Sequence, residues 1–248
     1  MKVLIVFAHP EAKSFNGALL ARSVEELIAQ RHEVRVSDLY AMNFNPVATA
    51  VDFHQRRFPD VLQYDREQKY SHQHHSFSED IAGEIEKLLW CDLLILQFPL
   101  WWFSVPAIMK GWIDRVFVNG AVYGAGRRYD TGGLKGRNAM VVTSTAAFEG
   151  MAAPDGLVGS LETILWPIQN GTLAYAGCKV LPPFVSWNVN FVDDATRRSY
   201  LEGYAARLRT LETTEPMFFH PLSDFGVDWR LKPGVEARAA GQSIQART

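Results

Sequence analysis

Hydrophobic and polar positions along the chain follow two different periods. Continuous apolar runs at Val3–Ala8, Leu93–Phe98 and Ala139–Thr143 are typical of parallel strands that are covered on both faces. Between these runs, apolar residues recur three or four positions apart, which is the spacing of one helix face. Such helical spacing occurs at Leu20–Ile28, Ile81–Leu89, Ala107–Phe117 and Leu201–Leu211.

Two weaker segments complete the predicted sheet. Glu33–Asp38 alternates between polar and apolar residues and predicts a second strand nearer the sheet edge. Val180 and Leu181 predict a short fifth strand that ends before Pro182–Pro183. Five strands alternating with helices indicate an α/β fold with a doubly wound, five-stranded parallel sheet and helices on both faces. Ligands of such sheets bind at the carboxyl ends of the strands, so the loops after the first, third and fourth strands are the candidates.

Three stretches lack a regular pattern. Residues 40–77 are aromatic and polar and too long for an ordinary loop, so we expect a functional excursion or a subunit arm. Residues 144–176 are rich in Gly and Ala and then apolar, which indicates a loop followed by a helix. After about Glu215 no strong periodicity holds. We therefore expect a main domain over residues 1–215 and a C-terminal extension, residues 216–248, that packs on the body or on a partner subunit.

The composition is that of a globular protein and excludes several function classes. A hydrophobic content of 48% suffices for a substantial core, and 25 basic against 27 acidic residues leave no electrostatic footprint for nucleic acid. No apolar stretch reaches the roughly 18–20 residues needed for stable membrane insertion, and the N-terminal run is better interpreted as a strand than as a signal peptide. Two cysteines, Cys91 and Cys178, cannot form a disulfide framework. We expect buried, reduced thiols and a cytoplasmic location.

The first candidate loop runs from His9 to Gly17. It lacks the G-x-G-x-x-G dinucleotide fingerprint. It places Ser14 and Asn16 at a helix N-terminus, where backbone N–H groups and the helix dipole favour an anion. Ser14 has the equally plain interpretation of a helix cap. His9 ends a strand that should point into the ligand crevice.

The other two loops follow the third and fourth strands. Pro99–Pro106 contains three consecutive aromatic residues, Trp101 to Phe103, which would cover a flat heteroaromatic ligand or pack in a dimer interface. Thr143–Gly150 is rich in small residues, which let backbone N–H groups approach a ligand closely.

A histidine cluster invites a metal interpretation. His72, His74 and His75 lie close together, but the segment lacks periodicity and neither cysteine is near it in sequence. We therefore favour a solvated loop and predict no metal. The chain also lacks H-E-x-x-H and P-loop motifs, so nothing indicates metal-dependent hydrolysis or phosphoryl transfer.

Long motifs at these loops resemble the NAD(P)H:quinone oxidoreductases, the DT-diaphorase group. They comprise the HP…SFN loop at His9–Asn16 and the runs Ser37–Pro46, Gln97–Trp112, Asp114–Phe117 and Leu165–Gly171. The resemblance extends from the first strand to Leu201–Tyr204. It implies a flavodoxin-like fold and a homodimer with two flavin sites at the subunit interface. It also implies non-covalent FAD rather than FMN, and ping-pong transfer of hydride from NAD(P)H to small-molecule quinones.

The resemblance assigns roles to particular residues. Two positions, Tyr123 and Tyr175, match aromatic residues that frame the nicotinamide and quinone pocket and are the predicted catalytic residues. The first loop would hold the phosphates and ribityl region, the second the isoalloxazine, the third would give backbone contacts, and a late helix would touch the adenine. The cofactor-binding set is His9, Ser14, Phe15, Asn16, Pro99, Leu100, Trp101, Trp102, Phe103, Thr145, Ala146, Ala147, Arg197 and Leu201.

The chain departs from the family pattern beside the flavin. A Tyr and a His that stabilise the reduced ring in the family fall on Ala152 and Val158, whose side chains neither donate hydrogen bonds nor carry charge. The two glycines by the flavin become Ala146 and Ala147, and a second pocket tyrosine becomes Ala125.

These departures leave two matters open. We expect backbone N–H groups of residues 146–150, or Arg127 or Arg128, to stabilise the reduced flavin in place of the missing side chains. The opened pocket keeps nitro- or azo-reduction as an alternative acceptor chemistry. Relatives of this fold that sit on potassium-efflux channels keep a regulatory flavoprotein subunit as an alternative from another class.

Overall fold

The computed structural model describes residues 1–239, 241 and 242. Its centre is a five-stranded sheet in the order β2-β1-β3-β4-β5, and each neighbouring pair of strands is parallel. This order is the flavodoxin-like form of the doubly wound α/β fold, and the predicted fold class is confirmed. The strands are β1 (Lys2–Phe7), β2 (Glu33–Asp38), β3 (Leu93–Pro99), β4 (Asn138–Ser144) and β5 (Lys179–Ser186).

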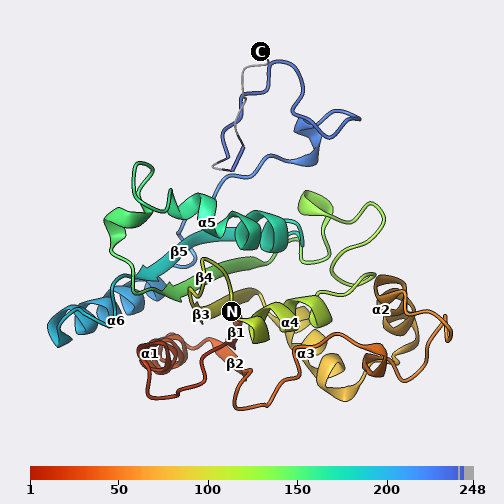
Figure 1. Ribbon diagram of the computed structural model, residues 1–248, viewed down its shortest axis with the longest axis horizontal. Coiled ribbons are helices and arrows are strands. Elements are labelled where there is room, and N and C mark those ends of the chain that lie inside the picture. Colours follow the sequence, from red (N-terminus) through yellow and green to blue (C-terminus); the bar gives the residue numbers. More distant parts are fainter. Residues whose placement is uncertain (240, 243–248) are drawn as a thin grey trace.

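Helices cover both faces of the sheet (Figure 1). Helices α1 (Phe15–Ala29) and α6 (Asp194–Arg209) pack against each other and bury one apolar cluster with the sheet. Helices α3 (Glu79–Trp90), α4 (Ala107–Val116) and α5 (Leu161–Ile168) bury a second cluster on the opposite face. The two-sided burial explains why β1, β3 and β4 have continuous apolar runs rather than an alternating pattern.

The fifth strand does not end before its prolines, so that part of the prediction was wrong. β5 continues through Pro182 and Pro183, and the register shifts at this point. Leu181 pairs with Met140 and Phe184 pairs with Val142, so two residues of β5 face one residue of β4. A bulge on an edge strand accommodates proline because no ladder hydrogen bond is required from its nitrogen.

The segment 40–77 is an excursion with its own helix, α2 (Tyr64–His74), preceded by a short 3₁₀ turn at Ala50–Asp52. The buried residues of α2 are the polar Glu67, Gln68 and Ser71, which is why the sequence shows no apolar periodicity there. The expected histidine loop was therefore wrong: His72 and His74 lie in the last turn of α2, and His75 is its cap, with φ of 53°.

Buried ion pairs fix this excursion to the body. Arg115, 2% exposed at the end of α4, contacts Asp52 at 2.9 Å and Asp80 at 2.8 Å and donates to the carbonyl oxygen of Asn45 at 2.7 Å. The Tyr64 hydroxyl donates to the same Asp52 carboxylate. The pKa of Tyr64 is strongly raised, first by burial and then by this hydrogen bond.

The segments after α5 differ in how closely they pack against the rest of the domain. Helix α5 continues as a π-helical stretch, Gln169–Ala174, before β5. Past α6, the N–H of Met217 donates to the carbonyl oxygen of Val180, and the N–H of Leu222 to the Asp130 carboxylate. Beyond these anchors the extension, in dark blue, projects away from the sheet on the side of α5 (Figure 1). Contact of residues 216–248 with a partner subunit stays a prediction, and residues 240 and 243–248 lie outside the described part.

Both cysteines are buried thiols, as predicted. Burial raises the pKa of Cys91 to about 11 and that of Cys178 to about 12, which keeps both protonated at neutral pH. Within the described residues, none of the helices combines the length and the apolar character that crossing a membrane requires.

Candidate functional site

The three predicted loops and the segment after β5 meet at the carboxyl edge of the sheet. The N–H of Leu100 donates to the carbonyl oxygen of Ser144 at 2.8 Å, and that of Thr145 to Ser186 at 3.0 Å. Between the first and third loops, the Asn16 amide donates to the Ser144 hydroxyl at 2.7 Å. The structure therefore brings the predicted cofactor-binding loops together along one edge.

The first loop is organised around two polar side chains. Ser14 accepts a hydrogen bond from the N–H of Gly17 and caps α1, so the capping interpretation is confirmed. Asn16 is 3% exposed, and the buried Gln97 amide donates to its carbonyl oxygen at 2.7 Å. The side-chain oxygen of Asn16 is buried without a partner in the described part of the chain. His9 contacts the backbone of Glu11 through Nδ1.

The second loop contains a strained turn, Trp101–Ser104, which we term the aromatic turn. Trp101 and Ser104 exchange backbone hydrogen bonds at 3.2 and 3.0 Å, and Trp102 and Phe103 between them have φ of 50° and 59°. Two left-handed residues at the centre of a turn normally call for Gly or Asn, and other residues cost about 1–2 kcal/mol each. Trp102 is 94% exposed and Phe103 53% exposed. Strain combined with exposed aromatic rings indicates a site kept for a ligand.

Four backbone donors of the second and third loops have no partner within the described part of the chain. The N–H groups of Trp102, Phe103, Ala146 and Phe148 make no hydrogen bond within the described residues, whereas the N–H of Ala147 donates to the Thr145 hydroxyl. Adjacent loops with free N–H groups suit a ligand edge rich in carbonyl oxygens or negative charge.

The far end of the carboxyl edge holds a cavity of about 690 Å³ between α1 and α6. Its lining includes Lys13, Ser14, Phe15, Arg197, Arg198 and Leu201, so four of the predicted residues meet here. Arg197 donates to the carbonyl oxygen of Val189 and pairs with Asp194 at 2.6 Å. Lys13 and Arg198 form no ion pair with other described residues. The cavity is therefore positively charged and lies at the N-termini of two helices, an environment suited to phosphate.

The predicted catalytic tyrosines form a separate cluster. The rings of Tyr123 and Tyr175 are 6.4 Å apart, and Tyr129 packs on Tyr175 at 5.3 Å. They adjoin a cavity of about 230 Å³ that Phe117, Tyr123 and Tyr175 help to line. The pKa of Tyr123 is raised chiefly by burial, and further by electrostatic interaction with Asp65 and then with Tyr175. Tyr129 was not predicted, because nothing in the pattern around it marks it as part of a pocket.

Within a single chain, this cluster lies far from the aromatic turn. Tyr175 precedes β5 and Tyr123 follows α4, so both lie at the amino edge of the sheet, whereas the aromatic turn follows β3 and lies at the carboxyl edge. Six or seven residues of parallel strand separate the two edges by about 20 Å. Arg127, which donates to the carbonyl oxygen of Gly120, and Arg128, which lies over the Trp229 ring, belong to the amino edge too.

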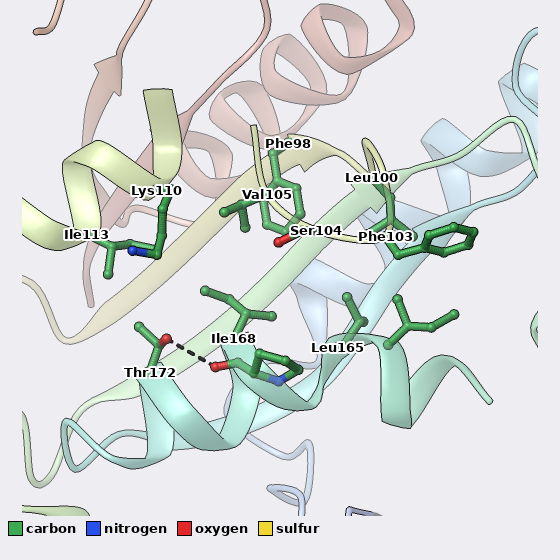
Figure 2. A pocket seen from close by; sticks show the side chains of 12 residues that line it. Phe98, Leu100, Phe103, Ser104, Val105, Lys110, Ile113, Leu165, Ile168 and Thr172 are labelled. Atoms are coloured by element: carbon green, nitrogen blue, oxygen red, sulfur yellow. Dashed lines mark hydrogen bonds between the residues drawn. The ribbon is translucent and has the colours of Figure 1, made fainter. Parts of the chain in front are cut away.

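An apolar groove between α4 and α5 connects the two edges. The groove contains a cavity of about 130 Å³. Leu100 and Phe103 lie at one end of it, and Lys110 and Thr172 lie at the other (Figure 2). Ile113 and Thr172 line both this cavity and the tyrosine cavity, so the groove runs along the helices from edge to edge. The sequence signal for the groove is weak, because its apolar residues also fit an ordinary helix–sheet core.

The positions that replace the family's Tyr and His contribute no polar side chain. Ala152 is buried, and the N–H of Val158 donates to the carbonyl oxygen of Met151, which closes the loop on itself. As for metals, the described residues contain no group of three His, Cys, Asp or Glu side chains arranged to hold an ion.

Comparison with known proteins agrees with this geometry. A family model described as flavodoxin-like fold matches residues 1–210. The chain is 43% identical to the mouse (Mus musculus) ribosyldihydronicotinamide dehydrogenase [quinone] over 221 residues, 89% of this chain and 96% of that protein. It is 38% identical to NAD(P)H dehydrogenase [quinone] 1 of Cavia porcellus over 230 residues, 92% of this chain and 84% of that protein. A crystal structure described as a quinone reductase from Klebsiella pneumoniae superposes with a TM-score of 0.90 at 37% identity, covering 98% of this chain and 100% of that one.

Proposed function

The chain belongs to the flavodoxin-like family of quinone-reducing NAD(P)H dehydrogenases, and from this premise we propose that it is a flavin-dependent NAD(P)H:quinone oxidoreductase. The observation that carries the proposal is that one edge of the sheet holds both the aromatic turn, with its exposed rings and N–H groups unpaired among the described residues, and, at its far end, a cavity suited to phosphate. When bound, the flavin supplies the redox chemistry: it takes hydride from NAD(P)H and passes two electrons to a quinone.

The residues of the carboxyl edge fit such a cofactor. Trp102, Phe103 and Leu100 would lie against the flat ring system, and Ser14, Phe15 and Asn16 against the ribityl chain and phosphate. The unpartnered side-chain oxygen of Asn16 supports this placement, because a ribityl hydroxyl is a suitable donor once the loop adjusts.

Backbone N–H groups take over the role of the missing Tyr and His. The N–H groups of Trp102, Phe103, Ala146 and Phe148, which have no partner in the described part of the chain, would hold the negative charge that the ring system carries after hydride transfer. Preorganised donors of this kind contribute about 3–4 kcal/mol each in enzymes where one has been removed. Arg127 and Arg128 would join them only across a subunit boundary.

We propose FAD rather than FMN as the flavin. The phosphate of FMN would end at the N-terminus of α1, whereas the cavity continues past Ser14 to Arg197, Arg198 and Leu201 on α6. That length and its positive charge suit the second phosphate and adenosine of FAD. Heat-released flavin separated by chromatography decides the matter: FMN as the released flavin contradicts this assignment.

We also propose a homodimer whose sites are shared between subunits. The aromatic turn and the Tyr123–Tyr175 cluster lie at opposite edges, and the apolar α4–α5 groove joins them. A two-fold axis across this groove would place the tyrosines of one copy beside the aromatic turn of the other, because an isologous interface reverses the direction of the shared elements.

The function is tested with the purified protein. We expect it to be yellow, to lose its visible absorbance on anaerobic addition of NADPH or NADH, and to regain it with a quinone. Ribosyl dihydronicotinamide belongs in the donor panel, since that donor appears in the name of the mouse relative. Protein that stays colourless with added FAD and FMN contradicts the proposal. We place the enzyme in the cytoplasm, in keeping with its two buried thiols.

Shared sites are tested by complementation. A Trp102→Ala subunit and a Tyr123→Ala subunit should each form weakly active homodimers. Their heterodimer contains one site with both defects and one with neither, so we expect about half the activity of a wild-type dimer. Activity no higher than that of the two homodimers contradicts the shared site, and a monomer in analytical ultracentrifugation contradicts the dimer.

A further inference from the structure

A buried glutamine from the excursion reaches the hydroxyl group of Tyr123. Gln68 on α2 is 2% exposed, and its carboxamide makes three hydrogen bonds. Its Nε2 donates to the carbonyl oxygen of Asp114 at 2.9 Å, and its Oε1 lies 3.3 Å from the N–H of Asn119 and 3.2 Å from Oη of Tyr123. The excursion that contains α2 has no role at the tyrosine pocket in the proposal above, so the proposal does not explain this contact.

The two backbone partners fix the orientation of the Gln68 amide. A carbonyl oxygen can only accept, so Asp114 must face the NH₂ group. A backbone N–H can only donate, so Asn119 must face the oxygen. Because the same oxygen faces Tyr123, the phenol has to donate its proton to Gln68. Tyr123 Oη is therefore left with lone pairs, and its one donor is committed.

The direction of this hydrogen bond distinguishes between the two substrates. A quinone offers carbonyl oxygens, which need a donor, whereas a dihydronicotinamide offers a carboxamide N–H, which needs an acceptor. Tyr123 is one of the residues that line the tyrosine cavity, and with its proton donated to Gln68 its hydroxyl can serve a ligand there only as an acceptor. We propose that Gln68 is a positioning residue that holds the Tyr123 hydroxyl as a hydrogen-bond acceptor for the carboxamide N–H of the dihydronicotinamide donor. The inference rests on the proposed function.

Ping-pong kinetics allow each half-reaction to be measured separately. We expect Gln68→Met to lower kcat/KM for NADPH about five- to tenfold, the worth of one net hydrogen bond, and to lower kcat/KM for a short-chain naphthoquinone by less than about twofold. The reduced 3-acetylpyridine analogue of NADPH keeps the ring carbonyl but lacks the carboxamide N–H. Wild-type enzyme should prefer NADPH to this analogue by a similar factor, and Gln68→Met and Tyr123→Phe should both lose the preference.

Three further variants separate positioning from packing. In the Tyr123→Phe background, Gln68→Met should have no additional effect on the preference between the two donors. Gln68→Glu, buried and therefore held in the protonated form, keeps the acceptor oxygen and has an O–H donor for the Asp114 carbonyl, so it should keep the preference for NADPH. Gln73→Met makes the same replacement on the exposed face of α2 and should match wild type. Equal losses with both donors or in both half-reactions, or an undiminished effect in the Tyr123→Phe background, overturn the proposal.

A spectroscopic readout keeps this test independent of catalysis. With tyrosine labelled by ¹³C at Cζ, the resonance missing from Tyr123→Phe identifies Tyr123. It should shift in Gln68→Met and not in Gln73→Met; an unshifted resonance overturns the donation to Gln68. If the wild-type protein oxidises no dihydronicotinamide, the proposed function itself is wrong. An unshifted Tyr123 resonance contradicts only the role of Gln68, so the two failures are distinguishable.

Discussion

At the carboxyl edge of the sheet, the N–H groups of Trp102 and Phe103 have no partner among the described residues, and the backbones of both residues are left-handed. At the amino edge, about 20 Å away, Tyr123 donates to Gln68, and the Gln68 amide is itself saturated by two backbone groups. The contrast therefore concerns these particular groups: the turn has donors free for a ligand, whereas the Tyr123 hydroxyl and the Gln68 amide are paired with each other and with the backbone. Left-handed backbone occurs at both edges, since Tyr129 has a φ of 48°. Exposed donors that only water satisfies are available to a ligand, whereas the mutually paired Gln68 and Tyr123 side chains form a fixed wall.

The difference indicates that the two edges have different functions. Under the proposed function, the carboxyl edge would hold a large planar cofactor, and the amino edge would orient the molecule that approaches that cofactor. The wall depends on the excursion, because Gln68 comes from α2, which the Asp52–Arg115–Asp80 ion pairs fix to α4. Removing these ion pairs should therefore disturb the amino edge and leave the carboxyl edge unaffected.

The largest effect is expected from Arg115→Met. It leaves Asp52, which is 0% exposed, without its cation. Breaking a buried pair in this way costs about 3–5 kcal/mol. For a chain of this size we expect the melting temperature to fall by roughly 6–20 °C, measured by calorimetry.

The control for that change is an exposed ion pair. Arg35 lies 3.2 Å from Glu86, with the side chains 41% and 74% exposed, so Arg35→Met should change stability by less than about 1 kcal/mol. In Arg115→Met the KM for NADPH should rise while the flavin content stays near wild type. A loss of flavin as large as the loss of donor affinity would contradict the independence of the two edges.

A smaller effect is expected from relieving the strain in the aromatic turn. Trp102→Gly removes an exposed ring and gives the left-handed position the residue it favours. The gain in backbone conformation roughly cancels the greater entropy of glycine in the unfolded chain, so the apo-protein should melt within about 2 °C of wild type. Flavin affinity, by contrast, should fall about tenfold, since a stacked ring contributes about 1–1.5 kcal/mol.

Arg31→Gly is the matched control, because Arg31 also has a positive φ, of 63°, but lies between α1 and β2. It should leave flavin affinity unchanged in a fluorescence titration. If Trp102→Gly keeps full flavin affinity, the strained turn serves packing rather than the cofactor.

The sequence predicts these two edges unequally. The parallel sheet and the loops at its carboxyl ends follow from continuous apolar runs such as Val3–Ala8, because a parallel strand is buried on both faces. The aromatic turn was predicted as a ligand or interface element, since three aromatic residues in a loop have few other uses. Its left-handed backbone was not predicted, because Trp and Phe disfavour that conformation and tertiary contacts impose it.

The amino edge was largely beyond sequence reasoning. Helix α2 buries Glu67, Gln68 and Ser71, and burial of polar residues leaves no hydrophobic period to detect. The contact between Gln68 and Tyr123 joins residues 55 positions apart and depends on how the excursion packs against α4. Similarly, the bulge that lets β5 pass through Pro182 and Pro183 depends on β5 being the last strand of the sheet, which only the topology reveals.

The smallest effect is the alkaline stability of the amino edge. Burial raises the pKa of the Tyr123 phenol, so above about pH 10 the unfolded chain loses this proton before the folded protein does. The folded state then binds more protons than the unfolded state, and stability falls as pH rises. Tyr123→Phe removes this contribution, so its melting temperature should fall less than that of wild type between about pH 10 and 11.5. The difference should be modest, because Tyr64 and Tyr129, whose pKa values are also raised by burial, remain in the variant. Melting curves of the two proteins that stay parallel across this range would mean that the phenol is as well solvated folded as unfolded, and the amino edge would then be no fixed wall.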